Sequence, residues 1–316
     1  MTKLAAVPVE PSLDRLDNPL PRYFLATRPA FLSITLVGVL LGFAVAWHDG
    51  VVFDGLAALV ALALALLSHA GVNVLNDYYD HLNGTDAANT ERLFPFTGGS
   101  RFIQNGVLTP RQTLVFGLAL FLAVVLGGLW LMAHRGFGLF WIGLSGLLIG
   151  WVYSAPPLKL NSRGLGEVCV AVGFLLVVAG ADFVQRGGFD LAPWLVGLPY
   201  ALMVTNILYI NQFPDRTADL AAGKRHWVAR LRPETAARGY SLIAIMALAC
   251  LLFVTAERVS VWAVLPAFFP AVRAAVELRR HAAQPGLLAP AIRATILSAH
   301  LLAVLLAATL VLDRVL

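Results

Sequence analysis

Residues 51–75, VVFDGLAALVALALALLSHAGVNVL, form an apolar run that passes directly into the polar stretch Asn76-Asp77-Tyr78-Tyr79-Asp80. A helix of about 20 apolar residues is long enough to cross the hydrocarbon core of a bilayer. We therefore expect a membrane-spanning helix here, with a cluster of polar and acidic side chains at one of its ends.

The composition of the whole chain agrees with this expectation. Of its 316 residues, 59% are hydrophobic and only 13% are charged, whereas about 25% of residues are charged in an average soluble protein. So few charges cannot cover the surface of a soluble domain of this size. The composition excludes a soluble enzyme, a disordered protein and a disulfide-stapled secreted domain. It predicts an all-α integral membrane protein.

Further apolar runs of similar length follow along the chain, and together they predict nine transmembrane helices. The predicted spans cover residues 30–47, 51–75, 112–133, 137–153, 164–185, 191–211, 236–256, 259–278 and 290–312. We expect residues 23–316 to form a single transmembrane domain. Residues 1–22 carry no recognisable motif and are predicted to be a mobile cytoplasmic lead-in. The first 29 residues lack the apolar core of a cleavable signal peptide.

The distribution of basic residues predicts the orientation in the membrane. With the N-terminus in the cytoplasm, the external loops hold Arg135, Arg186, Arg258 and Arg314, which leaves 19 of the 23 Lys and Arg residues on the cytoplasmic side. Such an excess is typical of cytoplasmic loops. The net charge of +5 therefore indicates topology and not a nucleic-acid partner. We expect a multi-pass protein of a bacterial cytoplasmic (inner) membrane.

Seven oxygen-bearing side chains gather where two of the predicted spans reach the cytoplasm. They are Asn76, Asp77, Asp80 and Asp86 in the first motif and Asn211, Asp215 and Asp219 in the second. Within each motif, a spacing of four residues places side chains on one face of a continuing helix.

Carboxylates that cluster in this way repel one another and are costly near lipid unless a cation neutralises them. A set of ligands that contains only oxygen suits Mg²⁺, which usually shares a few carboxylates with substrate phosphates. Two facing motifs predict two Mg²⁺ ions that bridge one diphosphate, with the seven side chains as ligands. Helix-end caps and solvated loop charges are the alternative explanation, which suits one motif better than two on the same side.

Basic side chains lie in the connections beside both motifs. They are Arg28 before the first span, Arg101 after Gly98-Gly99, Lys159 and Arg163 between the fourth and fifth spans, and Lys224 and Arg225 after the second motif. Guanidinium and ammonium groups bind phosphate oxygens through charge-assisted hydrogen bonds. The backbone of Gly98 and Gly99 can add a small anion nest. We expect this set to bind a diphosphate, although topology alone explains any one of its members.

The sequence resembles UbiA-type intramembrane prenyltransferases over nearly its whole length. The matching stretches are Asn76-Asp77-Tyr78-Tyr79-Asp80, residues 211–219 with Gly223-Lys224-Arg225, and Tyr153 with Arg163-Gly164-Leu165-Gly166-Glu167. The resemblance implies a helical bundle around a central cavity that opens to the cytoplasmic side, with two acidic-motif loops at the opening.

The first motif resembles one branch of this family more closely than another. Many members place an aspartate four residues after the position of Asp80, but here that position is Gly84 and the next carboxylate is Asp86. This spacing, the later Gly-Gly-Ser-Arg101 and the Arg28-Pro29 pair resemble the 1,4-dihydroxy-2-naphthoate prenyltransferases of menaquinone synthesis. The 4-hydroxybenzoate branch is less similar. The resemblance thus implies a naphthoate acceptor that loses CO₂.

The resemblance also implies Mg²⁺-dependent transfer of a polyprenyl group from its diphosphate. Asp80 and Asp215 are the expected catalytic metal ligands, and Lys159 is the expected catalytic cation beside the leaving diphosphate. Tyr153 is predicted to stabilise an allylic cation through its ring, with Tyr209 as the second candidate. Anchoring of these rings at the membrane interface is the alternative for both.

Other functions are compatible with parts of the sequence. The same chemistry can act on 4-hydroxybenzoate, on homogentisate or on a chlorophyllide-like acceptor. A membrane transporter is the alternative from another class, but transporters often keep polar groups near the bilayer midplane, whereas here they lie at one face. Diphosphate release that depends on substrate separates the two classes.

Isolated polar and sulfur side chains inside the apolar runs allow a weaker alternative, a haem site. His69 and His300 lie within predicted spans, but their spacing does not match a ligand pair, so we expect polar packing residues. Cys169 and Cys250 also lie within apolar runs and are expected to be small core residues.

Three further polar residues need an explanation. Asp182 lies toward the external end of the fifth predicted span, where an uncharged residue is expected, and we expect it to reach the membrane interface. His81 and His226 flank the two acidic motifs, and we expect both to be solvated loop residues.

Overall fold

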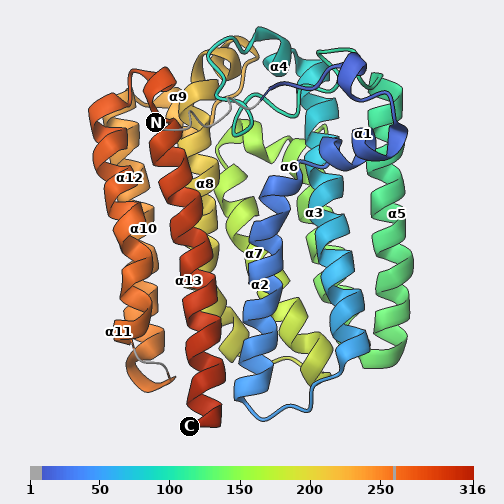
Figure 1. Ribbon diagram of the computed structural model, residues 1–316, viewed down its shortest axis with the longest axis vertical. Coiled ribbons are helices and arrows are strands. Elements are labelled where there is room, and N and C mark those ends of the chain that lie inside the picture. Colours follow the sequence, from blue (N-terminus) through green and yellow to red (C-terminus); the bar gives the residue numbers. More distant parts are fainter. Residues whose placement is uncertain (1–8, 259–260) are drawn as a thin grey trace, which may run out of the picture.

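The computed structural model describes residues 9–258 and 261–316, and every regular element in these two stretches is helical. The long helices lie nearly parallel in one bundle (Figure 1). The helices are α1 (Pro19–Ala26), α2 (Pro29–His48), α3 (Gly55–Asn83), α4 (Thr85–Ala88), α5 (Pro110–Arg135), α6 (Gly138–Ser154), α7 (Gly166–Arg186), α8 (Ala192–Ala221), α9 (Trp227–Arg230), α10 (Pro233–Arg258), α11 (Val261–Val264), α12 (Phe268–His281) and α13 (Ala289–Val315), with 3₁₀ turns η1 (Leu13–Arg15), η2 (Leu160–Arg163), η3 (Leu265–Ala267) and η4 (Pro285–Leu287).

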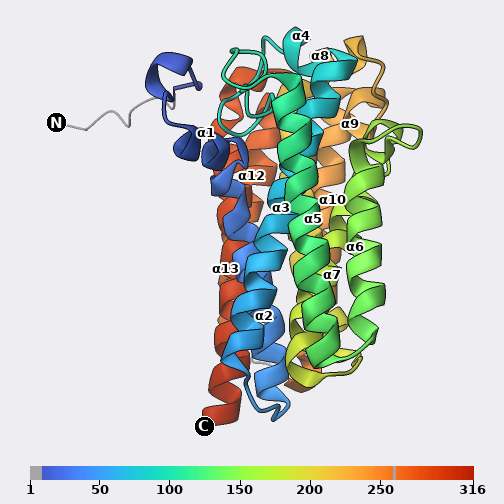
Figure 2. The same cartoon turned by 90° about the vertical axis from the view of Figure 1, so that its right-hand side faces the viewer.

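The two ends of the bundle differ. The short helices α4 and α9 and the longer connecting segments lie at one end, which we call the motif end, while the C-terminus lies at the other (Figure 1). Helix α1 stands beside the bundle at the motif end (Figure 2). The ends of α3 and α8 that carry the two acidic motifs therefore face the same side of the molecule.

The predicted count of nine spans is not confirmed. Seven helices of the described chain are long and apolar enough to cross a membrane, namely α2, α3, α5, α7, α8, α10 and α13. The predicted span 137–153 corresponds to α6, which is apolar but has only 17 residues. The predicted span 259–278 begins at residues outside the described stretches. Its described part is broken into α11, η3 and α12, and α12 carries Arg273 and Glu277.

Two helices extend well beyond the apolar runs that predicted them. Helix α3 begins after Asp54, whose side chain accepts a hydrogen bond from the backbone of Ala57 at 3.0 Å, a favourable N-cap. It ends only at Gly84, whose positive φ of 81° suits a glycine C-cap. Helix α8 continues through Pro214 to Ala221. Both acidic motifs therefore begin in the last turns of long helices and not in loops.

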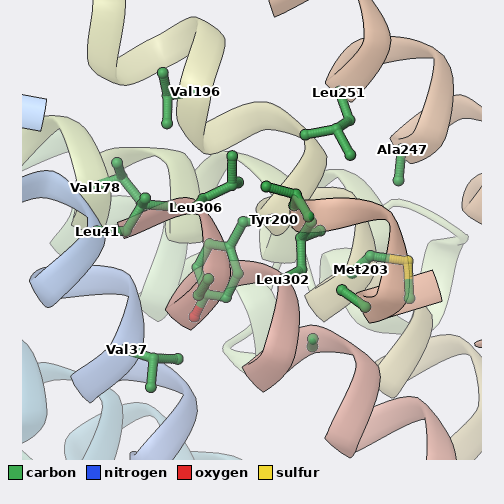
Figure 3. Close-up of a cluster of buried hydrophobic side chains, with 14 of the residues drawn as sticks. Val37, Leu41, Val178, Val196, Tyr200, Met203, Ala247, Leu251, Leu302 and Leu306 are labelled. Carbon is green, nitrogen blue, oxygen red and sulfur yellow. The ribbon is translucent and has the colours of Figure 1, made fainter. Parts of the chain in front are cut away.

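The largest buried cluster joins α2, α7, α8, α10 and α13. Tyr200 on α8 is completely buried among Leu41, Val178 and Leu302, and its hydroxyl donates a hydrogen bond to the backbone oxygen of Ile34 (Figure 3). Lipid tails are as apolar as leucine, so helix association in a bilayer depends on close packing and such hydrogen bonds. This cluster stabilises one half of the bundle. Helices α3, α5 and α6 form the other half and pack against it.

The backbones of two helices approach closely where α2 crosses α7. A Cβ added to Gly42 would lie 2.2 Å from the backbone oxygen of Val178 and 2.7 Å from Cβ of Ala181. We expect Gly42→Ala to lower the Tm of the purified protein by several degrees, because neither backbone can move away cheaply. Gly143→Ala is the control, since nothing lies within 4 Å of its added Cβ. An equal Tm for the two variants would contradict this account of the α2–α7 contact.

An ion-pair network closes the end of the bundle opposite the motif end, and it corrects the expectation for Asp182. This side chain is only 1% exposed and does not reach an interface. Its two oxygens accept hydrogen bonds of 2.9 and 2.8 Å from Arg186, which also contacts Asp49 at 2.8 Å. A buried carboxylate requires such a partner, so Asp182 ties α7 to the α2–α3 connection.

Candidate active site

The first motif places four polar side chains at the end of α3 and in α4. Asp80 accepts a hydrogen bond from Asn83 at 3.1 Å and forms an ion pair with Lys224 Nζ at 2.9 Å. Asp77 is 4% exposed and lies on a different side of the helix end. Asn76 donates a 2.8 Å hydrogen bond to Ser154 of α6. The motif therefore faces two directions, toward α8 through Asp80 and toward the 89–109 connection through Asp77.

The second motif lies at the end of α8 and faces the first. Asp219 is buried and lies 3.1 Å from Lys224 Nζ through its Oδ1 atom. Asp215, one turn earlier, accepts a 2.5 Å hydrogen bond from Asn89. Asn211, a further turn away, has a buried Oδ1 atom without a hydrogen-bond partner among the described residues. The predicted stripe of three side chains along one helix face is present.

Lys224 links the two motifs. Its buried ammonium group bridges Asp80 of α3 and Asp219 of α8. Burial alone would lower the pKa of Lys224, but the two carboxylates outweigh this effect and raise its pKa above the usual value. The loop returns to this position because Gly223 has a positive φ of 77° and the Lys224 backbone donates to Asp219 at 2.8 Å.

His226 is also part of this cluster, so its predicted role as a solvated loop residue was wrong. The side chain is 2% exposed, and Nε2 lies 3.0 Å from Oδ2 of Asp219. Its Nδ1 accepts a hydrogen bond from the backbone of Ala229 at 3.3 Å, which caps the start of α9. The position of His226 could not be read from its sequence neighbours, because the contact depends on how the loop folds back onto α8.

One of the protein's own carboxylates lies beside the predicted anion nest at Gly98-Gly99. Both glycines have positive φ values, and the next backbone N–H, that of Ser100, donates to Asp77 at 3.2 Å. Asp86 lies on the same side of Gly99 as Asp77, and its Oδ2 accepts a 3.4 Å hydrogen bond from Gln104. Burial, together with the carboxylates of Asp80 and Asp77, raises the pKa of Asp86 well above its usual value. An added cation would relieve this cost.

Gly99 is therefore a position where substitution is expected to disturb the cluster directly. A Cβ there would lie 2.5 Å from Asp86 Oδ2 and 3.0 Å from Asp77 Oδ1. We expect Gly99→Ala to reduce prenyl transfer by about 100-fold, because misplacing active-site groups by even 1 Å has costs of this order.

Gly106→Ala is a matched control in the same connection. Gly106 has a φ of 69°, close to the 72° of Gly99, but nothing lies within 4 Å of its added Cβ. Both variants share the backbone strain of about 1–2 kcal/mol, and only Gly99→Ala meets the carboxylates. Initial rates of prenyl transfer measure the difference, and equal rates for the two variants would contradict this explanation.

Two of the predicted diphosphate ligands, Arg101 and Arg28, lie in and beside the 89–109 connection. Arg101 is 8% exposed, has a positive φ of 67°, and donates a hydrogen bond to the backbone oxygen of Asp86. Arg28 stands at the start of α2 with φ 58°, donates to the backbone of Phe96 at 3.1 Å and covers the ring of Phe31 at 4.7 Å. Both guanidinium groups therefore hold this connection in place.

The other predicted diphosphate ligands lie outside the buried cluster. Arg163 is exposed and donates to the backbone oxygen of Pro157 at 2.8 Å. Arg225 is exposed, and its backbone N–H donates to Ser162 at 2.7 Å. Lys159 is half-buried, with a positive φ of 44° at the start of η2. Of the predicted basic set, only Lys224 contacts carboxylates of both motifs.

Two residues beside the cluster were not predicted from the sequence. Asn89 holds Asp215, as described above, and is 2% exposed. Glu10, in the predicted mobile lead-in, lies 2.7 Å from Arg92 and accepts a 3.3 Å hydrogen bond from Asn105. The described part of the N-terminal segment therefore contacts the 89–109 connection. Neither residue belongs to a repeated motif, so the sequence offered no signal for them.

A cavity of about 510 Å³ begins beside the motif cluster and continues between α2, α3, α5, α6 and α7. Tyr153 and Asn73 line it, and Tyr153 directly precedes Ser154, which binds Asn76. Most other lining residues are aliphatic or aromatic. Tyr209 does not line this cavity; it is 4% exposed and donates to the backbone of Ala236 at 3.0 Å. Tyr209 is therefore a packing residue and not a second cavity aromatic.

Comparison with known proteins shows which family has this arrangement. The sequence pattern described as the UbiA prenyltransferase family matches residues 35–299, which include both motifs and the cavity helices. The chain belongs to the UbiA prenyltransferase family. The resemblance predicted from the motifs is thus confirmed, and the protein is a prenyltransferase.

Several curated relatives in this family share a similar level of identity. The chain is 29% identical over 203 residues to the 1,4-dihydroxy-2-naphthoate octaprenyltransferase of Bacillus subtilis (strain 168), which is 63% of this chain and 62% of that protein. The Escherichia coli (strain K12) protein of the same name is 29% identical over 71% of this chain and 73% of its own length. A Synechocystis 2-carboxy-1,4-naphthoquinone phytyltransferase is 30% identical over 66% of each chain.

Solved structures show the same fold. A UbiA homolog from Archaeoglobus fulgidus, bound to GPP and Mg²⁺, superposes with a TM-score of 0.59 at 15% identity, covering 92% of this chain and 99% of that one. The structure of the homolog bound to DMAPP and Mg²⁺ gives the same TM-score at 16% identity. The all-helical membrane fold is therefore shared across distant sequences.

Proposed function

We propose that this protein transfers a polyprenyl group from its diphosphate to 1,4-dihydroxy-2-naphthoate, with loss of CO₂, as in menaquinone synthesis. The observation that carries the proposal is that a buried acidic cluster lies next to an apolar cavity. One end of this space suits a charged diphosphate and the other suits a hydrocarbon chain. The names of the curated relatives support the naphthoate acceptor.

The donor set fits a divalent cation that is shared with the substrate. Among the described residues, no three His, Cys, Asp or Glu side chains are arranged to hold a metal ion by themselves. Mg²⁺ usually keeps several waters and takes one or two carboxylates together with substrate phosphates, so it does not require such a group. The unpaired Oδ1 atom of Asn211 and the cost of the buried Asp86 carboxylate both favour an added cation. The Mg²⁺-bound Archaeoglobus structures support this assignment.

Each motif would then hold the metal from one side of the diphosphate. The metal ligands from α3 and α4 would be Asn76, Asp77, Asp80 and Asp86. Those from α8 would be Asn211, Asp215 and Asp219. When bound, Mg²⁺ would neutralise the diphosphate and act as a Lewis acid on its leaving oxygen. Lys224 would exchange part of its contact with Asp80 and Asp219 for phosphate oxygens.

The chain's other groups would position the leaving group and protect the reacting carbon. Lys159, Arg28 and Arg101 border the cluster and would attract the diphosphate, while Arg163 and Arg225 would act from the exposed rim. As the allylic C–O bond breaks, the ring of Tyr153 would face the developing cation, which aromatic faces stabilise. The aliphatic walls of the cavity exclude water, which would otherwise quench the cation.

The reaction suits a particular placement in the membrane. We propose that the motif end faces the cytoplasm of a bacterium and that the protein lies in its inner membrane, with the N-terminus cytoplasmic. The placement of 19 of the 23 basic residues supports this orientation. The soluble head of a prenyl diphosphate would then enter from the cytoplasm while its tail remains in lipid.

Product analysis tests the function. The purified protein, in detergent with Mg²⁺ and geranyl diphosphate, should form prenylated naphthoquinol and release diphosphate only when 1,4-dihydroxy-2-naphthoate is present. Parallel reactions contain 4-hydroxybenzoate, homogentisate or a chlorophyllide. Product from one of these and none from the naphthoate would reassign the acceptor. Absence of product with every acceptor, together with transport in vesicles, would favour a transporter.

Complementation provides the test inside cells. Expression of the chain should restore menaquinone in a bacterial strain that lacks its naphthoate prenyltransferase. Failure despite full membrane expression would argue against the naphthoate acceptor, while the product assay still reports on the reaction class.

A further inference from the structure

The apolar cavity contains a histidine, His69, that the reaction described so far does not use. Its polar lining residues are Thr35, Ser68, His69, Asn73 and Tyr153. His69 lies in the middle of α3, where the neighbouring cavity walls are Val72, Phe174 and other apolar side chains. A polar ring in such a wall is costly unless it finds a hydrogen-bond partner.

Only one nitrogen of His69 has a partner in the described part of the chain. Its Nδ1 lies 2.7 Å from the hydroxyl of Thr35, which is 1% exposed on α2. The ring edge also meets Phe174, with 5.7 Å between the centroids. No described protein group bonds Nε2, and the residue is half-buried along the cavity wall. Thr35 and Phe174 thus hold the ring while one polar atom is left to a ligand.

His300, the other histidine inside a long apolar helix, shows what a purely structural histidine looks like in this bundle. Its Nδ1 is 2.8 Å from the backbone oxygen of Ile296, and its Nε2 is 2.9 Å from the hydroxyl of Ser33. Both ring nitrogens are therefore satisfied by the protein. Their positions within apolar runs predicted the same packing role for both histidines, and the structure separates them.

The position of His69 along α3 suits contact with an acceptor ring in the cavity. On α3, His69 lies one turn before Asn73 and two turns before Asn76, which corresponds to about 6 and 10 Å along a helix axis. A prenyl diphosphate that is held at the motif end places its reacting carbon just inside the cavity, near Tyr153. An aromatic ring that attacks this carbon must lie beside it, within reach of the α3 wall.

We propose that His69 binds a ring hydroxyl of the aromatic acceptor through Nε2, and that Thr35 is a positioning residue that orients the imidazole. This inference rests on the proposed prenyl-transfer function and identifies a residue that selects hydroxylated aromatic acceptors. A prenyl chain offers no hydrogen-bonding atom, so it cannot satisfy Nε2. An acceptor that lacks the hydroxyl covers this nitrogen without pairing it and is rejected.

Steady-state kinetics of purified His69→Phe test the proposal, with 1,4-dihydroxy-2-naphthoate and geranyl diphosphate as substrates. The KM for the naphthoate should rise by about 10- to 100-fold, while the KM for geranyl diphosphate changes by less than about twofold. Thr35→Val keeps the imidazole but loses its orientation, and should raise the same KM to a smaller extent. His300→Phe is the matched control and should leave both constants unchanged.

A hydroxyl-free analogue separates binding from a general change in cavity shape. The inhibition constant of 2-naphthoate, which lacks both ring hydroxyls, should be equal for the wild-type protein and for His69→Phe. A parallel rise for 2-naphthoate and the dihydroxy acceptor would show a collapsed cavity and overturn the proposal. Thr35→Val retains His69 and provides the same comparison if His69→Phe does not fold.

Different results would overturn the role of His69 and the prenyltransferase function. An unchanged KM for the naphthoate in both variants, with normal turnover, would overturn the role of His69 and leave the prenyltransferase function intact. Absence of wild-type turnover with every acceptor would remove the proposed function and this inference together.

Discussion

Removal of divalent cations with EDTA, or replacement of Asp80 or Asp215 with alanine, is expected to reduce prenyl transfer by about 1000-fold. Removing a single group that stabilises a transition-state charge typically costs 100- to 1000-fold in rate, and loss of the metal removes several such interactions together. Mg²⁺ should restore the activity of the EDTA-treated wild-type protein and should not restore that of the variants.

The two aspartates test opposite sides of the same site. Asp80 lies at the end of α3 and contacts Lys224 at 2.9 Å, whereas Asp215 lies on α8 and is held by Asn89 at 2.5 Å. If metal bridges a diphosphate between the two helices, the loss of either side disrupts the same interaction. The double variant should therefore be little worse than the single ones, because groups that act as a unit are not additive.

The measurement is the initial rate of product formation at saturating naphthoate and geranyl diphosphate. Asp14→Ala is the control, since Asp14 is an exposed carboxylate in the N-terminal 3₁₀ turn. Its rate should equal that of the wild-type protein. Full activity of the EDTA-treated protein, of Asp80→Ala or of Asp215→Ala would refute the metal–diphosphate proposal.

Features of the fold that depend on local sequence periodicity were predicted well. The apolar runs identified most of the long helices, and the spacing of four between Asn211 and Asp215 placed both on one face of α8. The bounds of the helices were less accurate, because polar residues can continue a helix beyond its apolar run. In the 259–278 region a single span was predicted from the hydrophobic content, but the described part is broken. Pro266 lies within η3, and α12 carries several charged side chains.

Contacts between distant segments could not be predicted from local patterns. His226 appeared to be a loop residue, yet it is buried against Asp219 at 3.0 Å. The Gly98-Gly99 pair was predicted to offer N–H groups to an anion, and the N–H of the next residue, Ser100, donates to Asp77 of the protein itself. In both cases the residue type indicated the chemistry, and only the folded chain determined which partner satisfies it.

Lys224 illustrates this difference and leads to the second large expected effect. The sequence predicted a diphosphate ligand, while the structure places its ammonium group between Asp80 and Asp219 at 2.9 and 3.1 Å. Lys224 is therefore an internal counter-ion of these two carboxylates. Removing one partner of a buried ion pair leaves the remaining charge uncompensated and typically costs about 3–5 kcal/mol.

Lys224→Met should accordingly lower both stability and activity, and Mg²⁺ should distinguish the two effects. Methionine fills similar space without a charge, so we expect a large decrease in Tm in EDTA and a partial recovery when Mg²⁺ is added, because the metal can neutralise Asp80 and Asp219 in place of the ammonium group. Prenyl transfer should remain at least about 100-fold below the wild-type rate in Mg²⁺, since the leaving diphosphate loses a buried cation. Arg280→Met, which removes an exposed charge on α12, should change neither property. A wild-type Tm for Lys224→Met in EDTA would show that the two carboxylates do not depend on Lys224 for neutralisation, and that the α3–α8 contact is held by other groups.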